Sequence, residues 1–410
     1  MTFLSFIFFI AQTSAATPEG LKQLHTLAKS QSETIKIAES REEQADARKS
    51  RAGGTLLPTV TGRYNYTEID PLPGADSAFR RINQYSALVN LNQPIYRAGA
   101  YAAYSFTKID VELQQRLREQ EGLGLWQTTT EAYYNLWMAR NDLENIKKLR
   151  EFSEDRAKEL RERVRVGRSR RGELMQAEAQ LASVDANVSR AENTLLAAQE
   201  RVNFLAGAEY GPAYGKLPES ADKAGALGEY LQQAQQRPDV KASAQTIQLT
   251  EKEISLAKAG HHPTVDFNAN YYFERTGILQ DSEWDVGVAV SVPIFQGGTV
   301  MAQTREAAER KRENVLAYER LKREVERDVR ILWQNVHTLD KVVSDLKVAQ
   351  SKAEATYQEN RKDYRYGLVT SLDVLVSLNE YIDNKRGFER AVLEREMLAL
   401  QLQLATGVSP

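Results

Sequence analysis

The sequence contains no cysteine. This absence excludes disulfides, thiolate metal sites, a cysteine nucleophile and a lipidated N-terminal cysteine. Neither sign of charge is in clear excess, because 54 lysines and arginines stand against 56 aspartates and glutamates. Nucleic-acid binding requires a concentrated basic surface, so we expect no nucleic-acid partner.

Long hydrophobic runs are missing too. No segment approaches the ~18 uninterrupted apolar residues of a membrane-spanning helix, so the protein would enter a membrane only as a β-barrel. A short apolar run at residues 3–10 and the small residues Ala15 and Ala16 predict a signal peptide over residues 1–16. No lysine or arginine precedes the run, which a start codon assigned too late would explain. The alternative is a frayed apolar helix start.

Proline is absent between Gly99 and Pro212, and again between Pro293 and Pro410. These stretches predict long helices over about residues 100–164 and 299–365, each roughly 100 Å long at ~1.5 Å per residue. Glycine turns would fold them back onto helices at about 173–204 and 372–404. A seam with alternating spacings of four and three predicts coiled-coil packing. It comprises Val325, Val329, Leu332, Val336, Leu339, Val343 and Leu346.

Several motifs occur twice, about 200 residues apart. The pairs are Pro58-Thr59-Val60 with Pro263-Thr264-Val265, Pro94-Ile95-Tyr96-Arg97-Ala98-Gly99 with Pro293-Ile294-Phe295-Gln296-Gly297-Gly298, Arg165-Val166-Gly167 with Arg365-Tyr366-Gly367, and Phe204-Leu205-Ala206-Gly207 with Leu404-Ala405-Thr406-Gly407. Such a duplication indicates a pseudo-symmetric structural unit rather than two independent enzymes. We assign repeat 1 to residues 17–207, a linker to 208–238 and repeat 2 to 239–410, with shorter helices over 19–51 and 239–259 before the strands.

Each repeat contains two segments with a period of two, at about residues 57–67 and 84–94, then 263–273 and 283–293. In the last of these, Trp284, Val286, Val288, Val290 and Val292 share one face and polar or small residues the other. The length of about ten residues suits a tilted strand in a ~30 Å hydrocarbon layer.

A soluble sandwich is the alternative interpretation of these strands. Four strands are too few to form the core of about 400 residues, and they are also too few to close a barrel by themselves. Because lipid tolerates no unpaired sheet edge, closure requires several chains. The periodicity does not choose between eight, twelve and sixteen strands.

The motifs at the two strand-to-helix junctions and at the two helix turns resemble those of the TolC family of outer-membrane efflux proteins. The second turn carries the longest motif, Arg365-Tyr366-Gly367-Leu368-Val369-Thr370-Ser371-Leu372-Asp373-Val374-Leu375. The resemblance implies a mainly helical, mixed α and β protomer and a homotrimer with a twelve-stranded β-barrel in outer-membrane lipid. A helical tunnel would extend into the periplasm.

The resemblance also implies a function. The protein would be a passive exit duct for small molecules or proteins, as in tripartite efflux and type I secretion. Its partners would be a periplasmic adaptor (membrane fusion protein) and an inner-membrane efflux pump or ABC transporter. The alternative from another class is a secreted or periplasmic coiled-coil structural or adaptor protein, which would stay in solution without detergent.

Family gates contain rings of acidic side chains that select cations. Asp373 lies at a family gate-acid position, Glu173 occupies the equivalent place in repeat 1, and Tyr364 matches a gate tyrosine. The family often has a second aspartate where this chain has Val376, and a gate arginine where it has Val369. These departures argue against a double acidic ring and against a salt-bridge lock.

Helix capping is the alternative role of the two acids, because carboxylates are favoured in the first turn of a helix. An adaptor would grip the turns, and glycine turn chemistry alone is the alternative there. The expected adaptor-binding residues are Arg165, Gly167, Arg365, Gly367, Leu368 and Ser371. The strand-to-helix junctions are marked by Pro94, Gly99, Pro293, Gly297 and Gly298.

Signals for catalysis are weak. His261 and His262 are adjacent, but no acidic or histidine partner follows at ligand spacing. Gly297 and Gly298 lack the glycine spacing of a phosphate-binding loop. We therefore expect no enzyme activity, no metal and no cofactor.

Overall fold

The computed structural model describes residues 18–68, 83–214, 217, 225–276 and 281–410. The predicted signal peptide and part of the predicted linker lie outside these residues. In the described chain, no helix combines enough length with enough apolar character to cross a lipid bilayer.

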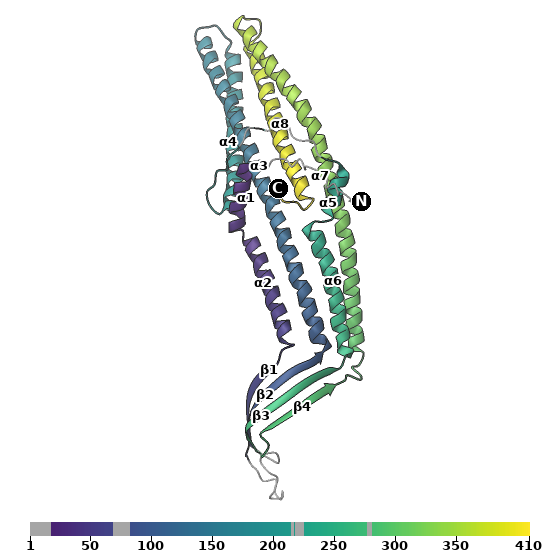
Figure 1. The fold of residues 1–410 in the computed structure, drawn as a ribbon. Helices are drawn as coiled ribbons and strands as arrows, with labels where there is room; N and C mark the ends of the chain where they lie inside the picture. Colours follow the sequence, from purple (N-terminus) through teal and green to yellow (C-terminus); the bar gives the residue numbers. More distant parts are fainter. Residues whose placement is uncertain (1–17, 69–82, 215–216, 218–224, 277–280) are drawn as a thin grey trace, which may run out of the picture. The chain divides into compact units, whose positions relative to one another are not determined.

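The elements follow one order twice, as the duplication predicts: two helices, two strands and a long helix hairpin (Figure 1). The fold is mainly helical with four strands, in agreement with the expected fold class. The first set comprises α1 (Glu19–Gln31), α2 (Glu33–Gly54), β1 (Thr59–Glu68), β2 (Asn83–Arg97), α3 (Ala98–Arg165) and α4 (Arg171–Ala206). The second comprises α5 (Leu227–Ala234), α6 (Pro238–Lys258), β3 (Thr264–Arg275), β4 (Trp284–Ser291), α7 (Thr299–Arg365) and α8 (Ser371–Leu404).

The chain divides into two compact units, and both long helices pass from one unit to the other. Unit 1 contains residues 1–36, 119–237 and 322–410. Unit 2 contains residues 37–118 and 238–321. Unit 1 therefore holds the hairpin turns, whereas unit 2 holds the sheet.

The helix expected over residues 19–51 is interrupted at Ser32. Its backbone has ψ 112°, which is not helical. The Ile35 N–H donates to Ser32 Oγ at 3.3 Å, so the serine caps the start of α2. The second repeat has a similar interruption, because α5 lies within the predicted linker and residues 235–237 separate it from α6.

The sheet of unit 2 is antiparallel with the order β1-β2-β3-β4. Across it, Thr61, Asn90, Asn270 and Asp285 lie in one row. The Asn90 amide donates to Asn270 Oδ1 at 2.7 Å, and the Asn270 amide donates to Asp285 Oδ1 at 2.8 Å. The next row repeats the amide-to-amide bond between β2 and β3 at 2.7 Å. These bonds link three strands on one polar face.

The opposite face presents apolar side chains, each at least 47% exposed in the single chain. They are Val60, Tyr64 and Tyr66 of β1, Tyr271 and Phe273 of β3, and Trp284, Val286, Val288 and Val290 of β4 with the adjoining Val292. An apolar surface of this extent marks a contact with lipid or protein.

The two sequence-similar junctions differ in structure. β2 continues through Pro94 to Arg97 and joins α3 directly, with a register shift between Pro94 and Tyr96. β4 ends at Ser291, and the residues up to Gly298 are irregular. The reason is pairing: β3 supplies partners for β2 as far as Arg97, but for β4 only as far as Ser291.

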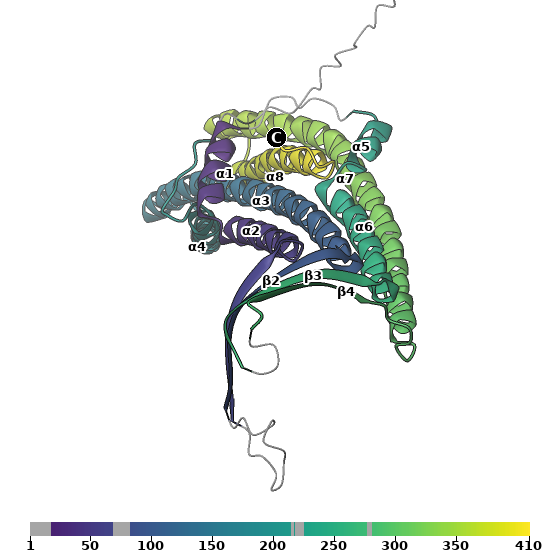
Figure 2. The same ribbon diagram turned by 60° about the horizontal axis from the view of Figure 1, so that its bottom comes forward.

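Within unit 2, α2, α3, α6 and α7 lie side by side in this order in both views (Figure 2). Ion pairs connect neighbours in the row. Arg48 of α2 contacts Asp110 of α3 at 2.7 Å, and Lys311 of α7 contacts Glu251 of α6 at 2.6 Å. Charged contacts therefore join neighbouring helices of this row.

A large apolar core lies in unit 1 and joins α1, α3, α4 and α8. Tyr133 is fully buried at its centre, and its hydroxyl donates to the Ala213 carbonyl at 3.1 Å. The buried members are Leu21, Leu24, Ala132, Tyr133, Tyr134, Leu136, Trp137, Val202, Ala206, Leu393 and Leu400. A second cluster, nearer the hairpin turns, includes Leu143, Ile146, Val184, Tyr357 and Ile382.

Candidate gate and docking site at the hairpin turns

The two hairpin turns share one backbone geometry and lie at the same end of unit 1 (Figure 1). Gly167 has φ +71° and Gly367 has φ +75°. The Arg168 N–H donates to the Arg163 carbonyl at 2.7 Å, and the Leu368 N–H donates to the Asp363 carbonyl at 3.0 Å. Positive φ favours glycine, so the repeated glycine ends each long helix in the same way.

Asp373 closes the second turn through a capping box. Its carboxylate accepts from the Thr370 N–H at 2.7 Å and from the Thr370 hydroxyl at 2.6 Å. The Asp373 N–H donates back to the Thr370 hydroxyl at 3.3 Å. The hydroxyl and backbone N–H of Thr370 lower the pKa of the Asp373 carboxyl, which is exposed and charged at neutral pH.

Glu173 occupies the equivalent place at the start of α4, but its contact differs. Its carboxylate accepts a hydrogen bond from the Ser169 hydroxyl. Arg170 occupies the N-cap position of α4, but its side chain makes no capping hydrogen bond. Both acids are exposed and lie in the first turn of their helices. The same two carboxylates are therefore placed both for the expected gate role and for the alternative role in helix capping.

Tyr364, in the last turn of α7, connects the two hairpins. Its hydroxyl accepts from Arg156 Nη1 at 2.9 Å and donates to Glu159 Oε1 at 3.1 Å. The Arg156 and Arg163 guanidinium carbons lie 4.9 and 5.4 Å from the centre of the Tyr364 ring. Arg163 also pairs with Glu159 at 2.7 Å. The Tyr364 ring and hydroxyl, together with the charged side chains of Arg156, Glu159 and Arg163, therefore join α7 to α3 near the turns.

Sequence reasoning missed Arg156, Glu159 and Arg163. Their spacing of three and four residues places them along one face of α3, a pattern that is typical of a solvated charged face. In fact the Arg156 side chain is only 13% exposed. Its Nε and Nη2 are buried without an acceptor among the described residues. A solvent-facing charge run would not contain such an arginine.

The expected adaptor-binding residues line the two turns in unit 1. Arg165 pairs with Glu162 at 2.9 Å, whereas Leu368 is 73% exposed. Arg365 ends α7 and Ser371 begins α8. The turns are therefore accessible in the single chain.

The expected junction residues lie in unit 2. Pro94 is within β2 and Gly99 within α3, whereas Pro293 follows β4. Gly297 and Gly298 have φ +59° and +78°, so the second junction needs glycine in a way that the first does not. The junctions and the turns are thus two separate groups of predicted residues.

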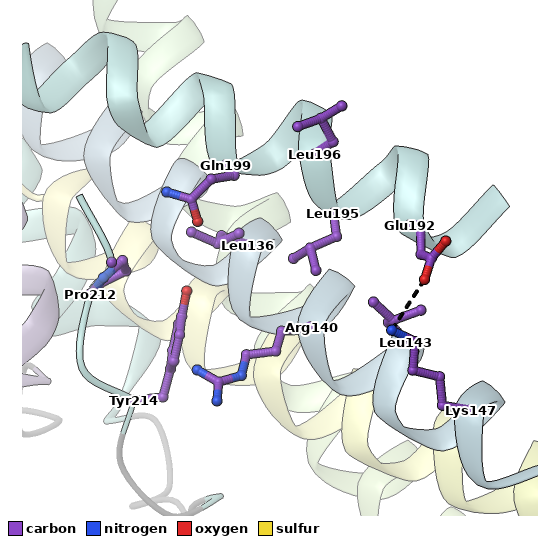
Figure 3. Close-up of a pocket in the computed structure, with 11 residues that line it drawn as sticks. Leu136, Arg140, Leu143, Lys147, Glu192, Leu195, Leu196, Gln199, Pro212 and Tyr214 are labelled. Atoms are coloured by element: carbon purple, nitrogen blue, oxygen red, sulfur yellow. Dashed lines mark ion pairs between the residues drawn. The ribbon is translucent and has the colours of Figure 1, made fainter. Parts of the chain in front are cut away.

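Unit 1 also contains a groove of about 600 Å³ along α3 and α4 (Figure 3). The Arg140 guanidinium lies 5.2 Å from the centre of the Tyr214 ring, and Lys147 pairs with Glu192 at 3.1 Å. Burial raises the pKa of Tyr214 to about 12. Leu136, Leu143, Leu195, Leu196, Gln199, Gly211 and Pro212 complete the lining. Sequence patterns did not reveal this groove, because it forms only where the chain after α4 folds back.

Metal ligands do not cluster in the part of the chain that the structure describes, where no group of three histidines or acids could hold an ion. His262 Nδ1 lies 3.1 Å from the Tyr96 hydroxyl. The adjacent histidines thus sit at the base of the sheet beside a tyrosine.

Comparison with known proteins gives a consistent result. The sequence profile of the family described as "Outer membrane efflux protein" matches residues 24–208 and 230–408, one match in each repeat. Outer membrane protein TolC of Vibrio cholerae is 23% identical over 96% of this chain and 92% of its own. TolC of Escherichia coli is 24% identical over 96% of this chain and 83% of its own.

Solved structures share the fold. The outer membrane protein VceC of Vibrio cholerae aligns with a TM-score of 0.81 and 20% identity, covering 95% of this chain and 96% of VceC. The CmeC outer membrane channel of Campylobacter jejuni aligns with a TM-score of 0.82 and 17% identity, covering 95% and 86%. These matches do not favour the soluble coiled-coil alternative, and the family is one of channels rather than of enzymes. The chain belongs to the outer membrane efflux protein family and functions as an outer-membrane exit duct, with its helical part in the periplasm.

Proposed function

We propose that three copies of this chain form one duct, with a twelve-stranded barrel in the outer membrane and a tunnel of helix hairpins. The observation that carries the proposal is the two-sided sheet. Its apolar face is exposed in the single chain, and its other face carries hydrogen-bonded asparagines. In a barrel, the apolar face would meet lipid and the amides would meet water.

The sheet edges support assembly from several copies. Among the described strands, β1 and β4 each pair with one neighbour. Since neighbouring strands alternate in direction, β4 of one copy can pair antiparallel with β1 of the next. Pairing removes the open edges, which are not tolerated in lipid. The likeness to the family favours three copies over two or four.

The turns form the gate in this proposal. Three copies of Asp373 and three of Glu173 would surround the narrow end of the tunnel, where negative charge attracts cations. The contact of Tyr364 with Arg156 and Glu159 would hold the two hairpins of a protomer together in the closed state. Opening would require this contact to break.

A periplasmic adaptor would grip the exposed turns and connect the duct to an inner-membrane pump or ABC transporter. Among the relatives, a proteases secretion protein of Dickeya chrysanthemi is 23% identical over 82% of this chain. That similarity makes a protein cargo one candidate and a small molecule the other. The energy and any catalysis belong to the transporter, so the duct itself performs no chemical step.

The native mass of protein extracted from the outer-membrane fraction in mild detergent tests the assembly. We expect a species of three chains that forms ion-conducting pores in planar lipid bilayers. A monomer or dimer that stays in solution without detergent would contradict both the barrel and the trimer. A larger ring that conducts would contradict the trimer alone.

A further inference from the structure

The two turns have the same backbone but opposite surface chemistry. Residues 166–171 of the first turn read Val-Gly-Arg-Ser-Arg-Arg, whereas residues 366–371 of the second read Tyr-Gly-Leu-Val-Thr-Ser. Three arginines in the first turn therefore stand where the second has no charged residue. The matching hydrogen bonds show that the backbone does not require this difference.

Three other arginines near the first turn are already paired. Arg161 contacts Glu178 at 2.7 Å, Arg163 contacts Glu159 at 2.7 Å, and Arg165 contacts Glu162 at 2.9 Å. The remaining acid of this turn, Glu173, accepts from a serine hydroxyl. The local acids are thus engaged elsewhere.

Arg168, Arg170 and Arg171 are different, because all three are exposed and none forms an ion pair with a described residue. They lie at the N-terminus of α4, where the positive end of the helix dipole adds to their charge. An arginine fork binds carboxylates through two parallel hydrogen bonds. Three unpaired forks in four residues form a surface suited to a cluster of carboxylates.

The second turn offers an apolar surface at the same end of unit 1. Tyr366 is 80% exposed and Leu368 is 73% exposed. Arginine, tyrosine and exposed apolar groups are together typical of protein interfaces. Arg163, beside the first turn, contacts Tyr364, beside the second, so one partner can reach both surfaces.

We propose that Arg168, Arg170 and Arg171 form a docking site for an acidic surface of the periplasmic adaptor. The assignment rests on the proposed function, which brings the adaptor to the turns. It adds that the two turns of one protomer recognise different chemistry, with acidic side chains bound at the first turn and apolar ones at the second. Binding at the first turn then depends on salt, because exposed charge pairs are screened.

The test uses the full-length protein in phosphatidylcholine nanodiscs and a fluorescent helical peptide with glutamates along one face. A peptide with glutamines in their place is the control probe. We expect the acidic peptide to bind at low salt and the control not to bind. The variant R168Q/R170Q/R171Q should weaken binding about tenfold, since each exposed pair contributes modestly. The variant R41Q/R305Q/R312Q removes three exposed arginines of α2 and α7 and should not weaken it.

Charge reversal provides the second variant. R168E/R170E/R171E should lose the acidic peptide and bind its lysine version instead. Equal binding of the acidic peptide to the wild type and to both turn variants would overturn the proposal. Arginine-dependent binding to phosphatidylglycerol vesicles, with no binding of the peptide, would also overturn it in favour of a lipid surface. Wild-type pore conductance tests the duct itself, so the two proposals can fail separately.

Discussion

The Tyr364 hydroxyl of α7 donates a hydrogen bond to the Glu159 carboxylate of α3, with 3.1 Å between the oxygens. The two residues are 205 positions apart and belong to different hairpins. Arg156, whose side chain is largely covered, has Tyr364 and Glu159 as its hydrogen-bond partners. This contact is a polar link between the two hairpins near their turns.

Tyr364→Phe removes one hydroxyl and leaves the ring in place. We expect the free energy of unfolding to fall by about 1 kcal/mol, the usual contribution of a hydrogen bond. We also expect pores to open more often, because the hairpins are then held less tightly. Single-channel recording and thermal melting measure the two effects. Tyr366→Phe is the control, since Tyr366 is 80% exposed and should leave both unchanged. Equal effects of the two variants would contradict a role for the contact in gating.

Two variants distinguish the role of the Asp373 charge from its role in capping α8. Asp373→Asn removes the charge and weakens the capping box, whereas Thr370→Val removes the hydroxyl bonds of the box, leaves the Thr370 N–H bond and keeps the charge. If Asp373 selects cations, only Asp373→Asn reduces cation preference and block by multivalent cations. Reversal potentials in a salt gradient measure this. An equal loss of selectivity in both variants would assign the residue to helix capping instead.

The same carboxyl has a consequence for acid stability. The Thr370 hydrogen bonds lower its folded-state pKa, so the unfolded chain binds a proton first as the pH falls. The stabilisation is present above the ordinary carboxyl pKa of about 4 and is lost as the pH falls below it. Melting temperatures of wild type and Asp373→Asn should therefore converge at low pH. A constant difference across the range would contradict this linkage.

His25 predicts a second loss of stability, in milder acid. Burial, and to a smaller extent Lys29, lowers the pKa of His25 to about 4. The imidazole stacks on Trp126 with 3.6 Å between ring centres, and Nδ1 lies 3.4 Å from the Thr129 hydroxyl. Since the unfolded imidazole takes its proton near pH 6.5, stability should decline from there towards pH 4, by about 3 kcal/mol at most.

His25→Phe keeps a ring against Trp126 and removes the titration. Thermal melting between pH 7.5 and 4.5, followed by tryptophan fluorescence, should show a smaller decline for the variant than for wild type. The difference should grow as the pH falls below about 6.5. Parallel curves for the two proteins would show that His25 is not responsible.

Gly99 and Gly298 are equivalent by sequence but not by structure. Gly298 has φ +78°, so Gly298→Ala should destabilise the junction by about 1 kcal/mol. Gly99 lies in α3, and an added Cβ would meet only Ala259 at 4.0 Å. Gly99→Ala should therefore be neutral or stabilise the helix by about 0.5–1 kcal/mol. Paired melting curves measure the contrast, and losses of equal size would refute it.

Much of this architecture is readable from local sequence patterns. The period of two in residues 284–292, the proline-free stretches and the glycines at 167 and 367 each act on their own segment through sterics and backbone freedom. The strand pairs and the two long hairpins therefore agree with the prediction. The acids after each turn were also visible, because helix starts favour carboxylates wherever they occur.

Contacts between segments that are distant in sequence could not be predicted from local sequence patterns. The partners of Tyr364 lie more than 200 residues away, and the burial of Arg156 depends on how α7 packs against α3. The interruption at Ser32 contradicts a helical pattern that continues through it, and the groove at Tyr214 depends on the chain folding back after α4.

Local sequence therefore decides which segments are helices, which are strands and where the hairpins turn, because those choices depend on neighbouring residues. Three features depend instead on packing: β2 runs directly into α3 while β4 stops short, paired asparagines join β2 to β3, and Arg156 joins the hairpins. Each of these depends on a partner that is distant in sequence. Its position is set by strand register and helix packing rather than by local propensity.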